Sequence, residues 1–245
     1  MKIRIKFRKY GLMRFIGHLD MMRYFQKAMR RADIDIAYSE GFSPHQIMSF
    51  AAPLGVGITS NGEYFDIEVH SSRSSKEALR ALNEVMVEGV QVTEYKRLPD
   101  HAPNAMSSVA ASSYTVHYKD PLRNPFSLPA LKEAIKDFYD GQEEILMTKQ
   151  TKKSQRILNL KPLIYQLEGV EEANPGFALQ LSAGSGENIK PELVLEAFYD
   201  YLKRKEWEIH PGYCSMNMQI HRLEVYTRDE KGGFLPLGGL GEDIL

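Results

Sequence analysis

The sequence predicts an α+β fold made of two tandem units, each with the element order βαββαβ and an antiparallel sheet. Three observations lead to this prediction. Residues 2–8 alternate perfectly between apolar and basic side chains, which is the period of a half-buried strand. Residues 19–32 then change to helical spacing, with one apolar face formed by Leu19, Met22, Phe25, Met29 and Ala32. The same order of elements returns after a small, polar segment at residues 99–112, and this order is that of the ferredoxin-like unit.

The first unit is expected to cover residues 1–98. Its opening strand would place Ile3, Ile5 and Phe7 beneath the helices, with the basic side chains on the open face. A capping box of Ser74 and Glu77 predicts the start of the second helix. The expected elements are a strand at 2–8, a helix at 19–32, a short strand near 34–38, a strand at 63–69, a helix at about 74–86 and a strand at 90–95, with a long insertion at 39–62.

The second unit, residues 113–228, follows a linker at 99–112 and is a more degenerate copy of the same order. Ser127 is the expected cap of its first helix, and Pro191 the expected start of its second. The remaining residues, 229–245, are rich in glycine and are expected to form a tail that is mobile when the chain is alone. The expected elements are strands near 114–119, 145–148, 177–181 and 218–226 and helices near 129–139 and 191–203.

Composition narrows the functional classes. The chain has 245 residues, of which 43% are hydrophobic, and no apolar run approaches the length of a membrane span, so we expect a cytoplasmic protein without a membrane partner. Cys214 is the single cysteine. A single cysteine excludes an internal disulfide, a Cys-rich zinc site and an iron–sulfur cluster held by this chain alone. We therefore expect no metal site.

Charge is distributed unevenly along the chain. Residues 1–31 hold ten lysines and arginines against Asp20 alone, a local net charge of +9, while the whole chain has a formal net charge of −1. Segregation of this size is typical of a surface that meets an anionic partner such as RNA.

The opening strand is the first candidate site. Arg4 and Arg8 would lie on the open face of the sheet, where many RNA-binding modules hold their ligand. The alternative is that Asp66 and Glu68 of the neighbouring strand pair with these basic residues. The first helix has a basic face opposite its apolar one, and we expect this basic face to be a solvated surface. Its residues are Arg23, Lys27, Arg30 and Arg31.

The loop after the opening strand is the second candidate site. Tyr10, Arg14, Gly17 and His18 precede or begin a helix, whose free backbone N–H groups attract anions. Arg14 could add a bidentate phosphate contact, and His18 could donate or transfer a proton. The alternative is that His18 caps the helix and Arg14 pairs with a carboxylate.

Two further segments contribute candidates. The insertion is expected to present Ser43 and His45, and the catalytic candidates for acid–base work are His18, His45 and Arg14. The sequence leaves open whether His18 and His45 form one site. In the second unit, Lys152, Lys153 and Arg156 belong to a basic run that is either a polyanion-contacting loop or a solvated one.

These stretches carry a family resemblance. The segments RFIGHLD at 14–20, SEGFSPH at 39–45 and SFAAPLGVG at 49–57 resemble the radical-SAM-linked protein family, a bacterial domain of unknown function found alone or fused to radical-SAM enzymes. Gln46 departs from the family pattern, in which a basic residue often follows the histidine. The resemblance implies a radical-SAM enzyme as partner. The iron–sulfur cluster and S-adenosylmethionine are then expected on that partner, and no cofactor on this chain.

Three functions remain open. The first is an accessory subunit without catalysis of its own, which binds a polyanion, with RNA as the expected ligand, and presents it to a radical-SAM enzyme. The second is an autonomous RNA-processing or RNA-modifying enzyme that uses Arg14, His18 and His45. The third is a protein-docking module that binds no nucleic acid. We rank them in this order.

Overall fold

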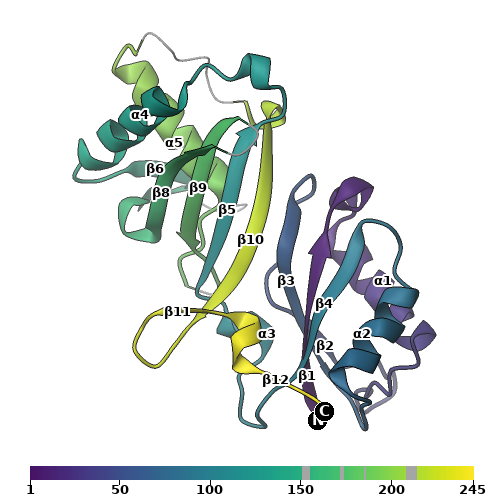
Figure 1. Ribbon diagram of the computed structural model, residues 1–245. Coiled ribbons are helices and arrows are strands. Elements are labelled where there is room, and N and C mark those ends of the chain that lie inside the picture. The colour runs from purple at the N-terminus through teal and green to yellow at the C-terminus, as the bar shows by residue number, and fades with distance from the viewer. Residues whose placement is uncertain (151–154, 172–173, 185, 208–213) are drawn as a thin grey trace. The chain divides into compact units, whose positions relative to one another are not determined.

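A computed structural model describes residues 1–150, 155–171, 174–184, 186–207 and 214–245. The chain divides into two units, residues 1–111 with 222–245 and residues 112–221. Mixed α and β structure with mostly antiparallel strands is confirmed (Figure 1). The assignment of both units to the ferredoxin-like class stays a prediction.

The first unit begins with the strand that the alternation predicts. Strand β1 buries Ile3, Ile5 and Phe7, and helices α1 and α2 lie on that side of the sheet (Figure 1). Phe7 packs edge-on against Phe25 of α1 and against Phe65 of β3. The strands follow the order β4-β1-β3-β2, and each of these neighbouring pairs is antiparallel. The elements are β1 (Lys2–Lys9), the short 3-10 helix η1 (Gly11–Phe15), α1 (His18–Arg31), β2 (Met48–Phe50), β3 (Thr59–Glu68), α2 (Ser75–Glu84) and β4 (Val90–Arg97).

The second strand of this unit lies later in the chain than predicted. Residues 34–38 form only two isolated bridges, Ile36 to Val69 and Tyr38 to Gln46, and the strand beside β3 is β2, inside the insertion. Asp33 takes a left-handed conformation with φ of 52°, and the amide of Ile36 bonds to the carbonyl of Ile34 at 2.7 Å. These tight turns use backbone groups that a continuous strand would need.

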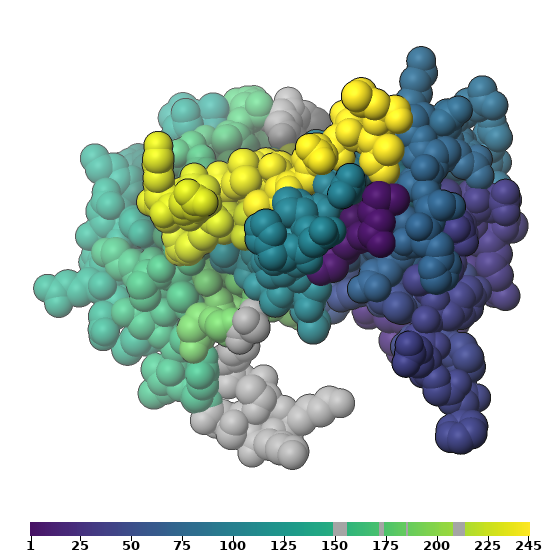
Figure 2. Space-filling view, turned by 90° about the horizontal axis from the view of Figure 1, so that it is seen from below, coloured from purple at the N-terminus to yellow at the C-terminus, as the bar shows by residue number. Residues whose placement is uncertain are grey.

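The glycine-rich tail is folded onto the first unit, which corrects the expectation of a mobile segment. It forms β11 (Phe234–Pro236), η5 (Leu237–Leu240) and β12 (Glu242–Asp243), and β12 pairs with β4. Leu237 is fully buried. Figure 2 shows the yellow C-terminal residues beside the purple N-terminal ones. The expected linker is ordered too, because α3 (Ala105–Ser108) buries Ala105 and Ser108.

The second unit has the strand order β5-β9-β8 and a separate β6–β7 ribbon, and strand β10 starts in this unit and continues into the first. Phe138, Phe177 and Phe198 pack together in its core. Ser127 caps α4 as predicted, whereas the sequence patterns do not predict β7 and β8. The elements are β5 (Ala111–Tyr118), η2 (Pro121–Arg123), α4 (Leu128–Asp140), β6 (Leu146–Gln150), β7 (Gln155–Asn159), η3 (Lys161–Leu163), β8 (Ile164–Glu171), β9 (Pro175–Ser182), α5 (Pro191–Arg204), η4 (Ser215–Asn217) and β10 (Met218–Arg228).

Candidate functional site

Arg4 is buried, so the prediction that it contacts RNA is corrected. Its side chain is 1% exposed and donates two hydrogen bonds to Asp66, at 2.8 and 2.9 Å. It also donates to the carbonyls of Leu237 and Pro103, at 3.2 and 3.3 Å. The folded tail therefore closes over the part of β1 that was expected to be open.

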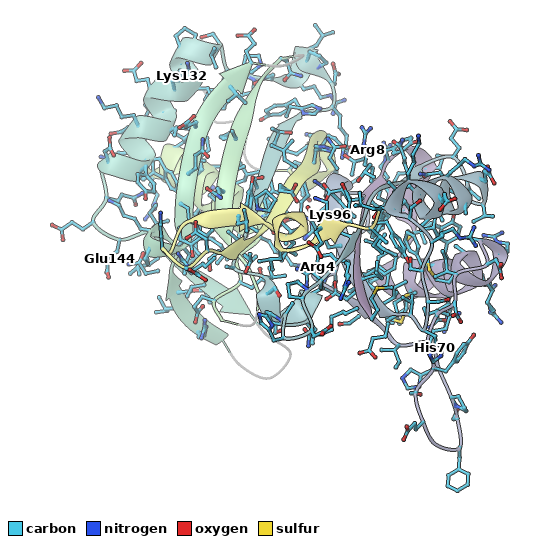
Figure 3. All side chains as sticks on the ribbon, turned by 60° about the horizontal axis from the view of Figure 1, so that its bottom comes forward. Arg4, Arg8, His70, Lys96, Lys132 and Glu144 are labelled. Atoms are coloured by element: carbon cyan, nitrogen blue, oxygen red, sulfur yellow. The ribbon has the colours of Figure 1, made fainter. Side chains whose placement is uncertain are left out.

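The next two basic residues of β1 have partners as well. Lys6 lies 2.6 Å from Glu224 of β10 and 3.5 Å from Glu94 of β4. Arg8 is exposed and bonds to Asn61 at 2.9 Å, with its guanidinium over the ring of Tyr10. Of the two arginines predicted to contact RNA from this strand, only Arg8 can be reached from solvent (Figure 3).

The predicted loop residues gather at the start of α1. Gly11 adopts a left-handed φ of 54° and turns the chain out of β1 into η1. Gly17 is the N-cap of α1, and because glycine has no side chain it leaves the first N–H groups of the helix without a capping acceptor. The amide of Gly57 bonds to the carbonyl of Arg14 at 2.8 Å, which holds the 51–58 loop against η1. Arg14 stacks over Phe15 at 4.8 Å. Among the contacts of the described residues it has no carboxylate partner.

His18 begins the helix and is partly buried against the sheet side of the unit. Its ring meets the ring of Phe50 edge-on, with centroids 5.2 Å apart. Burial lowers the pKa of His18, and the nearby charge of Lys9 lowers it further. The lowered pKa favours the neutral imidazole, which can donate or accept a hydrogen bond with a ligand.

Lys9 is a site residue that the sequence did not indicate. A register shift between Phe7 and Lys9 breaks the alternation of β1 and turns this lysine inward, where it is 2% exposed. Its ammonium donates to the carbonyl of Ile16 at 2.6 Å, just before α1. Burial lowers the pKa of Lys9, while the charge of Glu63 opposes this shift. A bulge of this kind has no clear signature in a single sequence.

Glu63 and Arg222 continue this buried network. Arg222 donates to both carboxylate oxygens of Glu63, at 2.9 and 3.1 Å, although 159 positions separate them. Burial raises the pKa of Glu63, and the bidentate contact with Arg222 acts against that rise. The pair joins Glu63, which lies opposite Phe7 of β1, to Arg222 of β10.

Large apolar side chains surround this helix start and face solvent. The exposed fractions are 82% for Leu12, 54% for Phe15 and 65% for Leu19. Val56, in the loop held against η1, is 64% exposed. We call the set Leu12, Arg14, Phe15, His18, Leu19 and Val56 the α1 N-terminal surface. Leu19 was predicted to lie on the buried face of the helix, and its exposure is a difference that only the packing of the unit reveals.

Ser43 and His45 lie elsewhere, so the composite site of His18 and His45 is not formed. His45 belongs to a hairpin at 38–46, in which its Nδ1 lies 2.8 Å from the hydroxyl oxygen of Ser39. Gln46 at the base of the hairpin donates to the carbonyl of Gln26, the ninth residue of α1. Eight residues of helix place this point about 12 Å along the axis from His18.

The remaining basic candidates are divided between the two units. On α1, Arg23 pairs with Asp20 at 3.1 Å. Lys27, Arg30 and Arg31 are exposed, and no contact of the described residues pairs them with a carboxylate. In the second unit, Arg156 pairs with Glu187. Lys152 and Lys153 lie outside the described residues.

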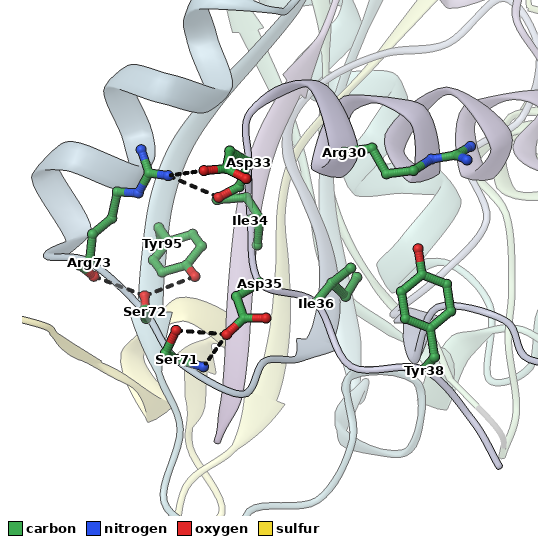
Figure 4. A pocket seen from close by; sticks show the side chains of 10 residues that line it. All are labelled: Arg30, Asp33, Ile34, Asp35, Ile36, Tyr38, Ser71, Ser72, Arg73 and Tyr95. Atoms are coloured by element: carbon green, nitrogen blue, oxygen red, sulfur yellow. Dashed lines mark hydrogen bonds and ion pairs between the residues drawn. The ribbon is translucent and has the colours of Figure 1, made fainter.

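A polar groove of about 570 Å³ lies near the C-terminal end of α1 (Figure 4). Arg73 donates to the carbonyl of Asp33 at 2.9 Å, and Asp35 accepts two hydrogen bonds from Ser71. Two arginines and two aspartates line it, Arg30, Arg73, Asp33 and Asp35, so the charges balance. The groove therefore offers no net attraction to a polyanion.

The described residues contain neither a cluster of metal-ligating side chains nor a membrane-spanning helix. Across the parts of the chain that the structure describes, no group of three or more His, Cys, Asp or Glu side chains could hold a metal ion. No helix among the same residues is long and apolar enough to cross a membrane.

Comparisons with known proteins identify a family. Residues 2–191 match the model of a family described as "Uncharacterized protein conserved in bacteria (DUF2344)". No curated protein matches the chain. Among solved structures, a chain of the "Crystal Structure of a Cbf5-Nop10-Gar1 Complex" is similar at 11% identity, with a TM-score of 0.47. The match covers 93% of this chain and 50% of that one, so this chain spans half the length of that protein.

Proposed function

The chain belongs to the bacterial family DUF2344, and from the α1 N-terminal surface we propose that it is a docking module that holds a partner protein. The observation that carries this proposal is the exposure of Leu12, Phe15 and Leu19 within eight consecutive residues. A cluster of exposed apolar side chains on a folded protein is typical of an interaction site.

The surface also specifies the chemistry of the segment it would hold. The uncapped N–H groups of α1 and the guanidinium of Arg14 both favour a negative charge. Neutral His18 can accept or donate a hydrogen bond beside them. We therefore propose a partner segment in which a carboxylate lies next to apolar side chains.

The support under this surface favours binding without rearrangement. Lys9 holds the carbonyl of Ile16, and Gly57 holds that of Arg14. A surface that is already ordered loses less conformational entropy when a partner binds.

The family resemblance suggests that the partner is a radical-SAM enzyme, which would carry the iron–sulfur cluster and S-adenosylmethionine. The chain would then act as an accessory subunit without catalysis of its own. The separation of His18 from His45 removes the acid–base pair on which an autonomous RNA enzyme was based.

Crosslinking in the native bacterium tests the proposal. In one variant a photoreactive amino acid replaces Leu12. In the control it replaces Leu122, a leucine of the second unit that is 95% exposed. We expect the variant at position 12 to crosslink one protein in high yield, and mass spectrometry to identify that protein as a radical-SAM enzyme. The control should give no crosslink. Equal yields from both positions, or a crosslink that nuclease abolishes, would contradict the proposal.

A second candidate function is RNA binding through the basic face of α1. The observation in its favour is that Lys27, Arg30 and Arg31 are exposed without a carboxylate partner among the described residues. Replacing all three by glutamine should then remove a salt-dependent affinity for total cellular RNA, whereas Arg4→Met should affect stability alone. RNA affinity that is absent in the wild type at low salt rejects this candidate.

A further inference from the structure

The hairpin at 38–46 presents a fully exposed aromatic side chain. Its strands are joined by the bridge between Tyr38 and Gln46 and by a hydrogen bond of 2.8 Å from the amide of Ser39 to the carbonyl of His45. Phe42 lies between them with an exposed fraction of 112%, so it contacts almost nothing in its own chain. Figure 3 shows the hairpin projecting from the unit near His70.

The hairpin has the wrong charge for an anionic ligand. Glu40 is its only carboxylate, and it has no lysine or arginine between 38 and 46. A nucleic acid or an anionic membrane surface would be repelled by Glu40 and would find no lysine or arginine to bind. A protein pocket with an apolar floor and a basic rim fits better.

The second unit contains a pocket of this kind, which we call the α5 pocket. Its volume is about 520 Å³, within the range of sites that hold small molecules. Phe138, Ile145 and Ala197 are buried at its floor, and Leu146 at its edge is 55% exposed. Lys203 and Arg204, at the end of α5, line it together with Asp200. Neither cation pairs with a carboxylate side chain among the described residues.

We propose that the hairpin of one copy of this chain enters the α5 pocket of a second copy. Phe42 contacts the apolar floor, and Glu40 pairs with Lys203 or Arg204. Each copy carries one hairpin and one pocket, so every copy can both give and receive this contact. The inference is independent of the proposed docking of a partner, because it uses none of the α1 N-terminal surface.

Sedimentation equilibrium over a wide concentration range tests the proposal with the full chain. We expect the wild type to self-associate and Phe42→Ser to weaken that association by roughly tenfold or more, since a buried aromatic side chain is lost from each contact. Leu122→Ser, which removes an equally exposed apolar side chain elsewhere, should associate like the wild type. A wild type that stays monomeric up to millimolar concentration, or equal effects of the two substitutions, would overturn the proposal.

A charge exchange provides the second measurement. Glu40→Lys and the double variant Lys203→Glu, Arg204→Glu should each associate weakly alone, because like charges then meet at the rim. In a mixture of the two variants, the positive charge introduced into one hairpin meets the negative charges introduced at the other variant's pocket rim. The unchanged Glu40 of the double variant meets the unchanged Lys203 and Arg204 of Glu40→Lys. Both contacts between unlike variants are therefore attractive, and the mixture should associate more strongly than either variant alone. Circular dichroism confirms that each variant is folded. Failure of the mixture to associate more strongly than either variant would also overturn the proposal.

Discussion

Removal of Asp66 decides whether the basic strand β1 serves the fold or a nucleic-acid ligand. The substitution Asp66→Ala leaves the guanidinium of Arg4 buried at 1% exposure without its carboxylate. Breaking a buried pair by removing one partner costs about 3–5 kcal/mol, because the remaining charge stays desolvated. A domain of ordinary stability has a free energy of unfolding of about 5–15 kcal/mol, so this loss is a large fraction of the total.

A second variant separates the cost of the unpaired buried charge from the cost of the lost hydrogen bonds. Arg4→Met combined with Asp66→Leu removes both charges and should recover most of the stability, since no charge is then buried alone. The recovery is incomplete, because the carbonyl of Leu237 loses the hydrogen bond from Arg4, whereas that of Pro103 keeps one from the hydroxyl of Ser108 at 3.4 Å. A buried acceptor without a partner costs about 1–3 kcal/mol.

Urea unfolding followed by far-ultraviolet circular dichroism measures these differences. Arg8→Gln, on the same face of the same strand but exposed, is the matched control and should change the free energy of unfolding by less than about 0.5 kcal/mol. The reasoning is refuted if Asp66→Ala is as mild as Arg8→Gln. It is refuted equally if Arg4→Met leaves stability unchanged and lowers RNA affinity.

Three further outcomes are expected. The hydroxyl of Ser74 caps α2 by accepting a hydrogen bond from the amide of Glu77 at 3.3 Å. Ser74→Ala should therefore lower the free energy of unfolding by about 1 kcal/mol in the same assay. An unchanged value would contradict the capping role. Leu237→Ala should cost about 2–5 kcal/mol, because the side chain is fully buried; a cost near zero would show that the tail is not packed. The folded pKa of His18 lies below its ordinary value of about 6.5, so the unfolded state binds more protons between these two values, and stability should fall as the pH drops through that window. An NMR titration of His18 with a midpoint at or above about 6.5 contradicts this expectation.

Local patterns in the sequence predicted much of the first unit. The alternation of Ile3, Ile5 and Phe7 placed the buried face of β1 correctly, and Ser74 with Glu77 located the start of α2. Both signals depend on residues a few positions apart, and their geometry follows from the period of a strand or the open end of a helix. The α1 start was also located by its residues, although the pattern placed Leu19 in the core.

The charges of β1 show where local patterns stop being sufficient. Asp66 is a partner that the sequence offers, because a strand with alternating residues is predicted beside β1. Glu224 and the carbonyl of Leu237 are not, since they belong to segments expected to form a second domain or a mobile tail. The inward turn of Lys9 depends on a bulge, which the alternation of residues 2–8 does not contain.

The sequence by itself determined the main helices, the buried face of β1 and the gathering of positive charge near the N-terminus. Only the tertiary structure decided that Arg4 and Lys6 of β1 are paired with carboxylates and that apolar side chains at the start of α1 stay exposed. The reason is physical: a side chain's period depends on its neighbours in the chain, whereas burial and pairing depend on residues brought together across the fold. Arg4 and Leu237, hydrogen-bonded across 233 positions, illustrate that distance.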